Sequence, residues 1–440
     1  MNSFELISNN SKKLILNFLL CCLPLSFILG NLAINLNIIL LVVISSFFYF
    51  NQIYRINFSL LEKITIVFFI FIFFTGLWNH FEINGLNLSN NNIIILKSIY
   101  FLRFLLLILV ISFLIKEDLF NFKFFFTSCL FFSAFVGFDI IYQYTFSQDI
   151  FGYKSAIGRE YTIPRRLSGP FGNEYIAGSY IQRFSIFGIC CLPLFYKIKK
   201  PYLAIILVSL FVLYCTTIIL SGNRMPLILF LISIFLIFLS EKRIRKYFLS
   251  SFVLILIIFS FFYLTNSAVK THFGNLKSIS VRIVSVFLVD VGLKNQKLTF
   301  NDIPSHYQEF RSFYETWKMN KYIGGGIKSF RINCHNRIIS NSYERVSCNT
   351  HPHNYYLEIF SDIGLVGFIL VLIILKLLIY RVLIKKNYRI DYPQQVFIIT
   401  MLILITEMIP LRSSGSFFTT GNATYIFLLL AILLGSQRKI

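Results

Sequence analysis

The sequence places two histidines and an asparagine immediately before a long apolar run. The string His351-Pro-His-Asn354 is followed, after nine residues, by a Gly-x-x-Gly pair at Gly364 and Gly367. An imidazole titrates near neutral pH and can take a proton from a hydroxyl group. Glycines inside a membrane helix let another backbone pack closely against it. The pattern therefore places an imidazole and an amide, His353 and Asn354, where lipid meets water. The alternative is a His-Asn pair that only caps a helix at this interface.

Further histidines and cysteines lie nearby, so a zinc site has to be weighed. His306, His335, His351 and His353 form no His-x-x-x-His pair, and the chain contains no Cys-x-x-Cys pair. Asp-x-Asp, the usual sign of a metal-bound nucleotide sugar, is also absent, as is a phosphate-cradling P-loop. We therefore expect neither a metal nor ATP, and no cofactor.

Two of the eight cysteines differ from the rest in their surroundings. Six fall inside apolar runs, where small buried residues are the default interpretation. Cys334 and Cys348 share a long polar segment. If that segment lies outside the cell membrane, a disulfide between them is chemically permitted.

Charged residues inside apolar runs are costly unless they are paired or line a cavity. Lys97 lies near the outer end and Arg103 near the middle of one run, and Asp139 lies in the next run. We favour a structural pair between Arg103 and Asp139 over direct ligand contact. Glu358 lies four residues after Asn354 on the same helical face, where it could orient the histidine region or offset the helix dipole.

The composition indicates a protein surrounded by lipid. Of 440 residues, 56% are hydrophobic and 52 are Phe, whereas 14% are charged. A soluble domain cannot bury that much apolar surface, and a disordered chain needs the opposite balance. The net charge of +22 is concentrated in clusters between apolar runs, such as residues 197–200 and 242–246, as in cytoplasmic anchors. A nucleic-acid partner is therefore not expected.

The apolar runs predict an all-α, polytopic integral membrane protein of about 12 transmembrane helices, each about 20 residues long. They begin near residues 13, 31, 63, 93, 124, 174, 202, 226, 248, 355, 394 and 423. The first run leads directly into the second without a signal-cleavage pattern, so we expect the first helix to be retained.

The distribution of basic residues predicts the orientation. With the N-terminus inside, the basic residues between alternate runs all face the cytoplasm, which satisfies the positive-inside rule. All six histidines then lie on the outer side, and both termini are cytoplasmic. The predicted organisation is nine helices with short loops over residues 1–265, a long periplasmic loop over 266–354, and three helices over 355–440.

The long outer segment is too large for an idle connection, since loops beyond about 15 residues are usually functional or disordered. Its residues 278–293 are apolar enough to lie on the membrane surface. Ser305 and Gln308 could form a capping box that opens a helix through Trp317, and the glycines at 324–326 then provide a turn. These patterns predict an ordered, partly helical loop.

A His-Asn pair, nine residues and Gly-x-x-Gly at the start of a late span resembles the signature of the O-antigen ligase and O-antigen polymerase superfamily. Three further strings are similar to that family, and the resemblance covers about residues 139–422. They are Arg166-Leu-Ser-Gly-Pro-Phe-Gly-Asn173, Ser221-Gly-Asn-Arg224 and Gly324-Gly-Gly-Ile-Lys-Ser-Phe330. The resemblance implies that His353 is catalytic and that Arg224 is an arginine the family needs.

The donor implied by this resemblance is a glycan linked through pyrophosphate to a polyprenyl lipid. Arginines at the outer interface could bind its phosphates and stabilise the leaving group, because a guanidinium donates a fork of hydrogen bonds. Snorkelling to lipid headgroups is the alternative for any single one. The candidate substrate-binding residues are Arg165, Arg166, Arg224, Arg311, Arg103, Lys97 and Asn354.

The implied activity is an inverting, metal-independent glycosyl transfer at the periplasmic face of the bacterial inner membrane. The acceptor is the hydroxyl of lipid A core for a ligase, or of a growing glycan for an O-antigen or exopolysaccharide polymerase. The basic outer surface favours the anionic lipopolysaccharide acceptor. A lipid-linked sugar transporter is the rival from another class, but it predicts inverted repeats and broken helices at matching positions, and we find neither in the sequence.

Overall fold

A computed structural model describes residues 8–81, 91–154, 166–240, 242–296, 303–336, 348, 353–385, 394–410 and 415–437. Their regular structure is helical, apart from an isolated bridge between Gln148 and Lys154. The elements in chain order are α1 (Asn9–Leu29), α2 (Asn31–Tyr54), α3 (Leu60–His80), α4 (Asn91–Phe101), α5 (Arg103–Lys116), α6 (Phe122–Phe146), η1 (Gly169–Phe171), α7 (Ala177–Phe195), α8 (Lys200–Leu220), α9 (Arg224–Ser240), α10 (Lys242–Thr265), α11 (Ser267–Asp290), α12 (Ser305–Met319), α13 (Phe330–Asn333), η3 (Cys334–Asn336), α14 (Tyr355–Ile379), η4 (Tyr380–Ile384), α15 (Gln394–Glu407) and α16 (Thr420–Gly435).

The predicted all-α fold is confirmed for the described residues, and each predicted apolar run coincides with a helix or a helix pair. Within that part of the chain, seven helices are long and apolar enough to cross a membrane, or up to eight if the bent pair Phe252–Thr265 and Ser267–Val289 is one span. The chain is thus a multi-pass membrane protein, and its number of crossings, expected at about 12, stays a prediction. The fourth predicted span consists of two helices, α4 and α5, that meet at Leu102.

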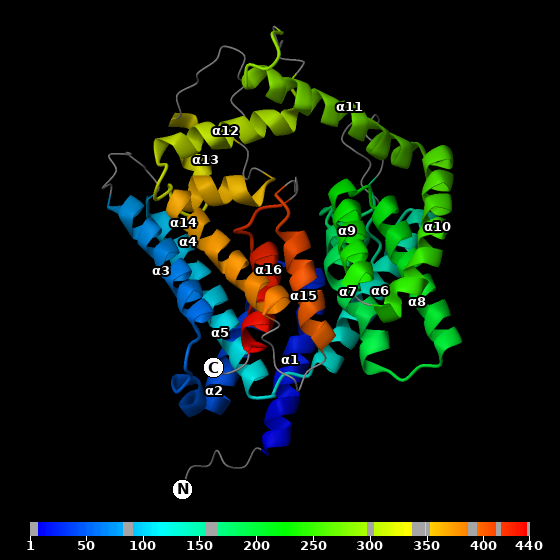
Figure 1. Ribbon diagram of the computed structural model, residues 1–440, viewed down its shortest axis with the longest axis horizontal. Coiled ribbons are helices and arrows are strands. Elements are labelled where there is room, and N and C mark those ends of the chain that lie inside the picture. Colours follow the sequence, from blue (N-terminus) through cyan, green and yellow to red (C-terminus); the bar gives the residue numbers. More distant parts are fainter. Residues whose placement is uncertain are drawn as a thin grey trace.

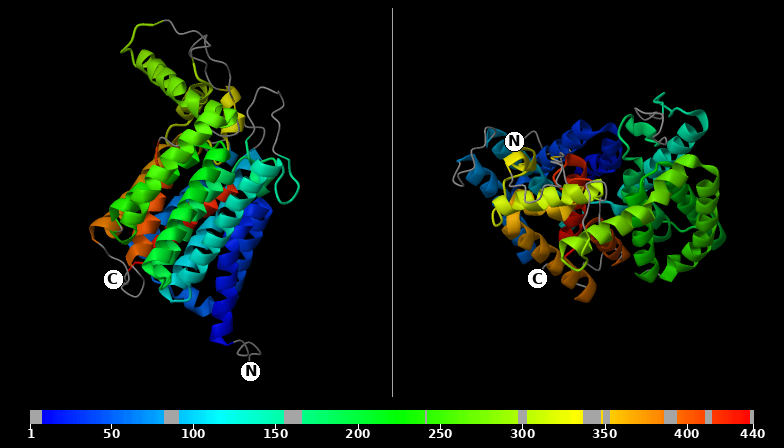
Figure 2. Two further views of the ribbon diagram at one scale, coloured as in Figure 1. Left: turned by 90° about the vertical axis from the view of Figure 1, so that its right-hand side faces the viewer. Right: turned by 90° about the horizontal axis from the view of Figure 1, so that it is seen from above.

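The helices form a bundle with α11 and α12 across one end (Figure 1). Seen from above in Figure 2, α6 to α10 lie together on one side of the molecule. On the other side α3 packs on α4 and α14, and α5 packs on α16. Helix α15 joins the two sides, since it contacts both α9 and α16. The start of α1 and the end of α16 lie opposite α11 and α12, which agrees with the predicted threading.

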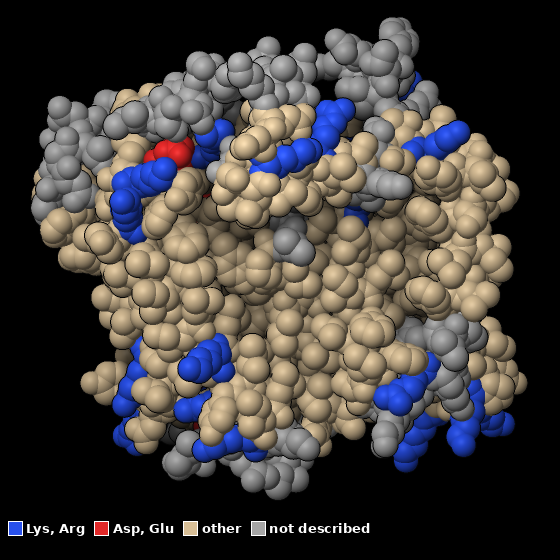
Figure 3. Space-filling model, turned by 45° about the horizontal axis from the view of Figure 1, so that its top comes forward, with Lys and Arg blue, Asp and Glu red and all other residues tan. Residues whose placement is uncertain are grey.

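The outer surface of the bundle is apolar. Large side chains such as Phe18, Leu32, Phe131 and Ile257 are each more than half exposed. Figure 3 shows this surface as a broad band without charges, with Lys and Arg gathered at its two edges. Exposed apolar side chains in a band bounded by basic residues are the arrangement that a bilayer with anionic headgroups stabilises.

Helix α14 is divided at Gly364, whose φ of 65° and ψ of −170° are not helical. The residues around this break pair with residues 321–326 of the long segment. Leu365 and Val366 donate backbone hydrogen bonds to Lys321 and Tyr322, at 2.9 and 3.1 Å. In return, the backbone N–H groups of residues 325 and 326 donate to the carbonyls of residues 361 and 362, at 3.0 and 2.7 Å. The long segment is thereby attached to the span through backbone groups that a continuous helix would have used internally.

Glycine is required on both sides of this attachment. A Cβ on Gly324 would lie 2.5 Å from the backbone nitrogen of Gly364, and a Cβ on Gly364 would lie 2.3 Å from the carbonyl oxygen of Tyr322. The close backbone packing expected at Gly364 is therefore confirmed, although the partner is a loop rather than another helix.

The start of α12 corrects one expectation. The helix begins at Ser305 with Pro304 in the cap position, and no side chain caps it. The Gln308 amide instead donates to the carbonyl of Ile303, at 3.0 Å. The predicted capping box is wrong because Pro304, rather than Ser305, has the extended conformation of a capping residue. The helix therefore begins at Ser305, one residue earlier than a capping box would require.

Candidate active site

His353 lies immediately before the residue that caps α14. Its φ of 55° is in the left-handed region, where histidine occurs more often than most side chains. The Asn354 side-chain oxygen accepts hydrogen bonds from the backbone of Tyr356 and Leu357, at 3.0 and 3.2 Å. Its amide nitrogen donates to the carbonyl of Pro410, at 2.7 Å. The cap therefore fixes the backbone beside His353, and a substrate contact by Asn354 stays a prediction.

Glu358, one turn into α14, fastens that helix to the segment before α16. Its carboxylate accepts hydrogen bonds from the Ser416 hydroxyl, at 2.6 Å, and from the backbone N–H of Phe417. The side chain is 2% exposed. The sequence suggested that Glu358 orients the histidine region or offsets the dipole of α14. In the structure, Glu358 holds the 415–418 segment against α14.

A group of cations lies beside the break in α14. The Lys328 backbone N–H donates to the Asp362 carboxylate at 2.6 Å, and Lys328 has a left-handed φ of 60°. Burial lowers the pKa of the Lys328 ammonium, and repulsion from Arg331 lowers it further, while Glu358 and Asp362 oppose both effects. Lys97 on α4 interacts electrostatically with the same lysine, arginine and aspartate. Sequence reasoning found Lys97 but missed its neighbours, because they adjoin it only in the folded chain.

Arg103 does not form the predicted pair with Asp139. Its guanidinium donates to the carbonyl of Tyr100 and to the Thr420 hydroxyl, the latter at 3.2 Å, and lies over the Phe104 ring. The Asp139 carboxylate accepts a hydrogen bond from the backbone of Ile150, at 2.8 Å. The prediction is wrong because the break between α4 and α5 exposes carbonyl groups that Arg103 can reach.

A buried arginine that the sequence analysis missed lies below Tyr355. Arg183 on α7 is 6% exposed and forms an ion pair with Glu407 of α15, at 2.7 Å. The same guanidinium donates to Asn422 at 2.7 Å and to the Tyr355 hydroxyl at 3.3 Å. We call these four residues the Arg183 network. An arginine inside an apolar run was the signal that could have revealed it.

Two predicted arginines come together at the turn between α8 and α9. This turn, residues 221–223, is called the Gly222 turn. Arg224 begins α9, and Arg166 lies close enough to repel it electrostatically. Within the described part of the chain neither guanidinium forms an ion pair or a hydrogen bond. Two uncompensated guanidinium groups at one turn are suited to bind a phosphate-containing anion.

Helix α7 connects the Gly222 turn to the histidine. The Asn223 side chain accepts a hydrogen bond from the backbone of Gly178 at 3.1 Å and donates to the carbonyl of Tyr175 at 3.2 Å. Five residues further along α7, Arg183 contacts Tyr355, which is two residues after His353. Because each residue of a helix advances the chain by about 1.5 Å, these two attachments are about 7.5 Å apart along α7. The Gly222 turn and the start of α14 are therefore neighbours at one end of the bundle.

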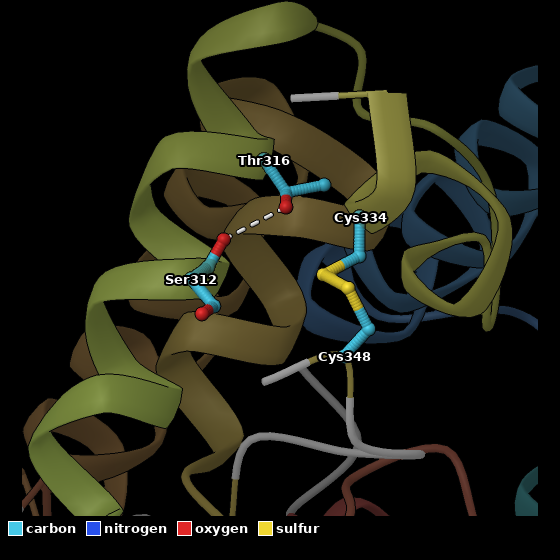
Figure 4. The surroundings of a disulfide bond; sticks show 4 residues. All are labelled: Ser312, Thr316, Cys334 and Cys348. Carbon is cyan, nitrogen blue, oxygen red and sulfur yellow. Dashed lines mark hydrogen bonds between the residues drawn. A yellow bond between two sulfur atoms is a disulfide. The ribbon is translucent and has the colours of Figure 1, made fainter. Parts of the chain in front are cut away.

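The cysteines Cys334 and Cys348 are joined by a disulfide, whose surroundings Figure 4 shows next to α12. In α12 the Thr316 hydroxyl donates to the carbonyl of Ser312, at 2.7 Å. Cys334 is buried with Phe313 of α12 and Phe330 of α13 in a small separate core. The disulfide therefore joins Cys348 to this small core.

The remaining candidate residues are Arg311, Arg165 and His351. Arg311 lies on α12, and its contact with the substrate stays a prediction. Arg165 and His351 fall outside the described residues. Among the residues that are described, no three His, Cys, Asp or Glu side chains are grouped so that they could hold a metal ion.

The chain was also compared with known proteins. Residues 209–372 match the family model described as O-Antigen ligase. No curated protein matches the chain. The matched region contains the Gly222 turn, the glycines that attach to the break in α14, and His353. The predicted resemblance is thereby confirmed: residues 209–372 are similar to the O-antigen ligase family.

Proposed function

We propose that the protein is a glycosyltransferase at the periplasmic face of the bacterial inner membrane. It moves a glycan from a polyprenyl pyrophosphate carrier to an acceptor hydroxyl. The observation that carries this proposal is the geometry along α7, which brings the uncompensated Arg166 and Arg224 near the histidine that precedes α14. A base beside a phosphate-binding site is what a transfer with a diphosphate leaving group requires.

The reaction that fits this site is an inverting displacement without a metal. The imidazole of His353 removes the proton of the acceptor hydroxyl while that oxygen forms a bond to the anomeric carbon of the glycan. The bond between the anomeric carbon and the diphosphate oxygen breaks, and its electron pair leaves with the polyprenyl diphosphate. Arg224 and Arg166 stabilise the charge on that leaving group, and the proton passes from His353 to solvent.

The orientation follows from charge and from the disulfide. The start of α1 and the end of α16 lie at the end of the bundle opposite α11 and α12, and we place both termini in the cytoplasm by the positive-inside rule. The end that carries α11, α12 and His353 then faces the periplasm. A disulfide between Cys334 and Cys348 is consistent with this side, because the periplasm is oxidising.

We favour lipid A core as the acceptor, which makes the protein an O-antigen ligase. Lys97, Lys328 and Arg331 gather beside the break in α14, so an anionic acceptor would meet positive charge there. A polymerase that extends an acidic glycan is the second candidate, because the same cations would suit its acceptor.

The test is lipopolysaccharide display in a deletion strain complemented with wild type, His353→Ala or the control His335→Ala. His335 is exposed on η3, next to the disulfide. We expect wild type and His335→Ala to restore capped core. We expect His353→Ala, at equal level in the membrane, to leave uncapped core and to accumulate lipid-linked chains. Core bearing a single repeat would assign a polymerase, and full activity of His353→Ala would reject the proposed base.

A further inference from the structure

A second histidine, His272, lies at the Gly222 turn. Gly222 has a left-handed φ of +69° and no side chain, which leaves room for two neighbours. A Cβ at this position would be 3.1 and 3.3 Å from Cδ2 and Nε2 of the His272 ring, and 3.4 Å from Cγ of Arg166. The imidazole and the stem of the arginine therefore pack against the same residue of the turn.

The first turns of α11 fix the position of His272. Asn266 caps the helix by accepting hydrogen bonds from the backbone of Ala268 and Val269, at 2.9 and 3.1 Å. Val269 and Phe273 are 2% and 8% exposed and belong to the main apolar core of the bundle. His272 itself is 5% exposed. The imidazole is thus held against the Gly222 turn by helix packing.

The charges around this turn call for an anion. Arg166 and Arg224 repel each other, and within the described residues no carboxylate pairs with either. A bound anion would relieve this repulsion, because each guanidinium can donate several hydrogen bonds to its oxygens. An imidazole at this turn adds a directional N–H donor, and when protonated it adds a third positive charge.

We propose that His272 binds the diphosphate of the lipid-linked donor together with Arg166 and Arg224. This inference rests on the proposed function and assigns the donor side of that site. The ligand chemistry is a diphosphate whose oxygens accept hydrogen bonds from both guanidinium groups and from the imidazole. His272 is a binding residue in this assignment, and proton removal from the acceptor stays with His353.

The assignment makes α11 part of the donor site. The helix α10, which precedes it, ends at Thr265, and the chain bends by 107° into α11. This bend is what brings His272 back over the turn between α8 and α9. The beginning of the long segment would then supply His272, which binds the glycan donor, while its end supplies His353, the base.

The test measures the affinity of the purified full-length protein for undecaprenyl diphosphate in nanodiscs of zwitterionic phosphatidylcholine. Two variants of His272 separate the effect of its hydrogen-bonding groups from the effect of its side-chain shape. His272→Phe keeps a ring against Gly222 without hydrogen-bonding groups, and His272→Asn keeps a donor in a smaller side chain. His335→Phe is the matched control at an exposed histidine, and His353→Ala tests the base.

We expect His272→Phe to weaken diphosphate binding about 10- to 100-fold, the scale of one hydrogen bond to a charged group. His272→Asn should bind more tightly than His272→Phe, whereas His335→Phe and His353→Ala should bind like wild type. Wild-type affinity of a folded His272→Phe protein would overturn the inference. So would equal affinity of the wild type for phosphatidylglycerol added to the nanodiscs, since the site would then hold a lipid headgroup.

Two further readouts keep the test decisive. If His272→Phe unfolds, the second readout is the ¹⁵N resonance of the His272 side chain in the wild type, which is assigned by its loss in His272→Asn. We expect this resonance to shift when diphosphate is added. An unchanged resonance would overturn the inference. If the wild type does not bind diphosphate, the proposed function fails together with the inference. If the wild type binds and only the His272 variants are unaffected, the inference fails alone and the proposed function stands.

Discussion

Two regions of this protein hold arginines near the start of α7, and the charges have opposite surroundings in the two regions. In the Arg183 network the guanidinium is buried against the Glu407 carboxylate, at 2.7 Å, and also bonded to Asn422 and Tyr355. At the Gly222 turn, Arg166 and Arg224 repel each other and form no ion pair within the described residues.

The difference separates structural charges from charges that await a ligand. The buried ion pair between Arg183 and Glu407, with its hydrogen bonds to Asn422 and Tyr355, helps to hold α7, α14, α15 and α16 together. Removing one partner of a buried ion pair is severely destabilising. Two cations without a counterion destabilise the empty site and are stabilised by an anion. Changes in the Arg183 network should therefore affect folding, whereas changes at the Gly222 turn should affect binding and transfer.

The largest effect is expected for Glu407→Gln. This change leaves the buried Arg183 charge without its carboxylate and should lower the free energy of unfolding by about 3 to 5 kcal/mol. The measurement is the unfolding midpoint of the purified protein in detergent. As control, the double variant Arg183→Gln with Glu407→Gln removes both charges and should recover most of the loss. Wild-type stability of Glu407→Gln with lost transfer would place the network in the active site instead.

Arg224→Gln should have the next largest effect, and on a different quantity. It removes a contact to the leaving diphosphate, so the rate of glycan transfer should fall about 100-fold. The unfolding midpoint should stay unchanged or rise slightly, because the repulsion from Arg166 is relieved. Arg224→Lys keeps the charge but not the fork of hydrogen-bond donors, and its transfer rate should lie between those of wild type and Arg224→Gln. A loss of stability equal to that of Glu407→Gln would abolish the contrast between the regions.

Gly222→Ala should give a smaller, mixed effect. The left-handed φ of +69° and the contact with the His272 ring should cost about 1 to 2 kcal/mol of stability and reduce donor binding. Gly421→Ala is the matched control, because this glycine is helical and its nearest neighbour would be Phe27 at 3.7 Å. That variant should be as stable as wild type or up to about 1 kcal/mol more stable. Equal behaviour of the two alanine variants would show that the Gly222 turn tolerates a side chain.

The smallest effect is expected for Asn354→Asp, between the two regions. Aspartate keeps the cap on the Tyr356 and Leu357 backbone but loses the hydrogen bond to the carbonyl of Pro410. The stability should fall by about 1 kcal/mol, the usual net value of one hydrogen bond, and the transfer rate should stay within about tenfold of wild type. A rate loss of about 100-fold at normal stability would instead indicate that Asn354 contacts the substrate.

The sequence predicted the helices well because apolar length is a local property. It also predicted that Gly364 allows close packing, whereas the roles of Arg166 and Arg224 stay predictions. It could not predict the partner of Arg103, since the carboxylate nearest in sequence was not the acceptor nearest in space. The break at Leu102 supplies that acceptor, and such breaks depend on tertiary packing.

The parts of the site that were missed depend on contacts between distant segments. Lys328 reaches Asp362 because residues 321–326 pair with the broken α14. His272 reaches the Gly222 turn because the chain bends between α10 and α11. Neither contact leaves a periodic or spaced pattern in the sequence, so only the folded chain reveals it.

The attachment at Gly364 also constrains how this chain can change over generations. A Cβ on Gly324 would lie 2.5 Å from the backbone nitrogen of Gly364, and a Cβ on Gly364 would lie 2.7 Å from the backbone nitrogen of Gly324. Backbone atoms cannot be replaced by smaller ones, so no substitution elsewhere compensates for a larger residue at either position. We therefore expect related chains that keep the broken helix to keep both glycines, which lie 40 positions apart in the sequence.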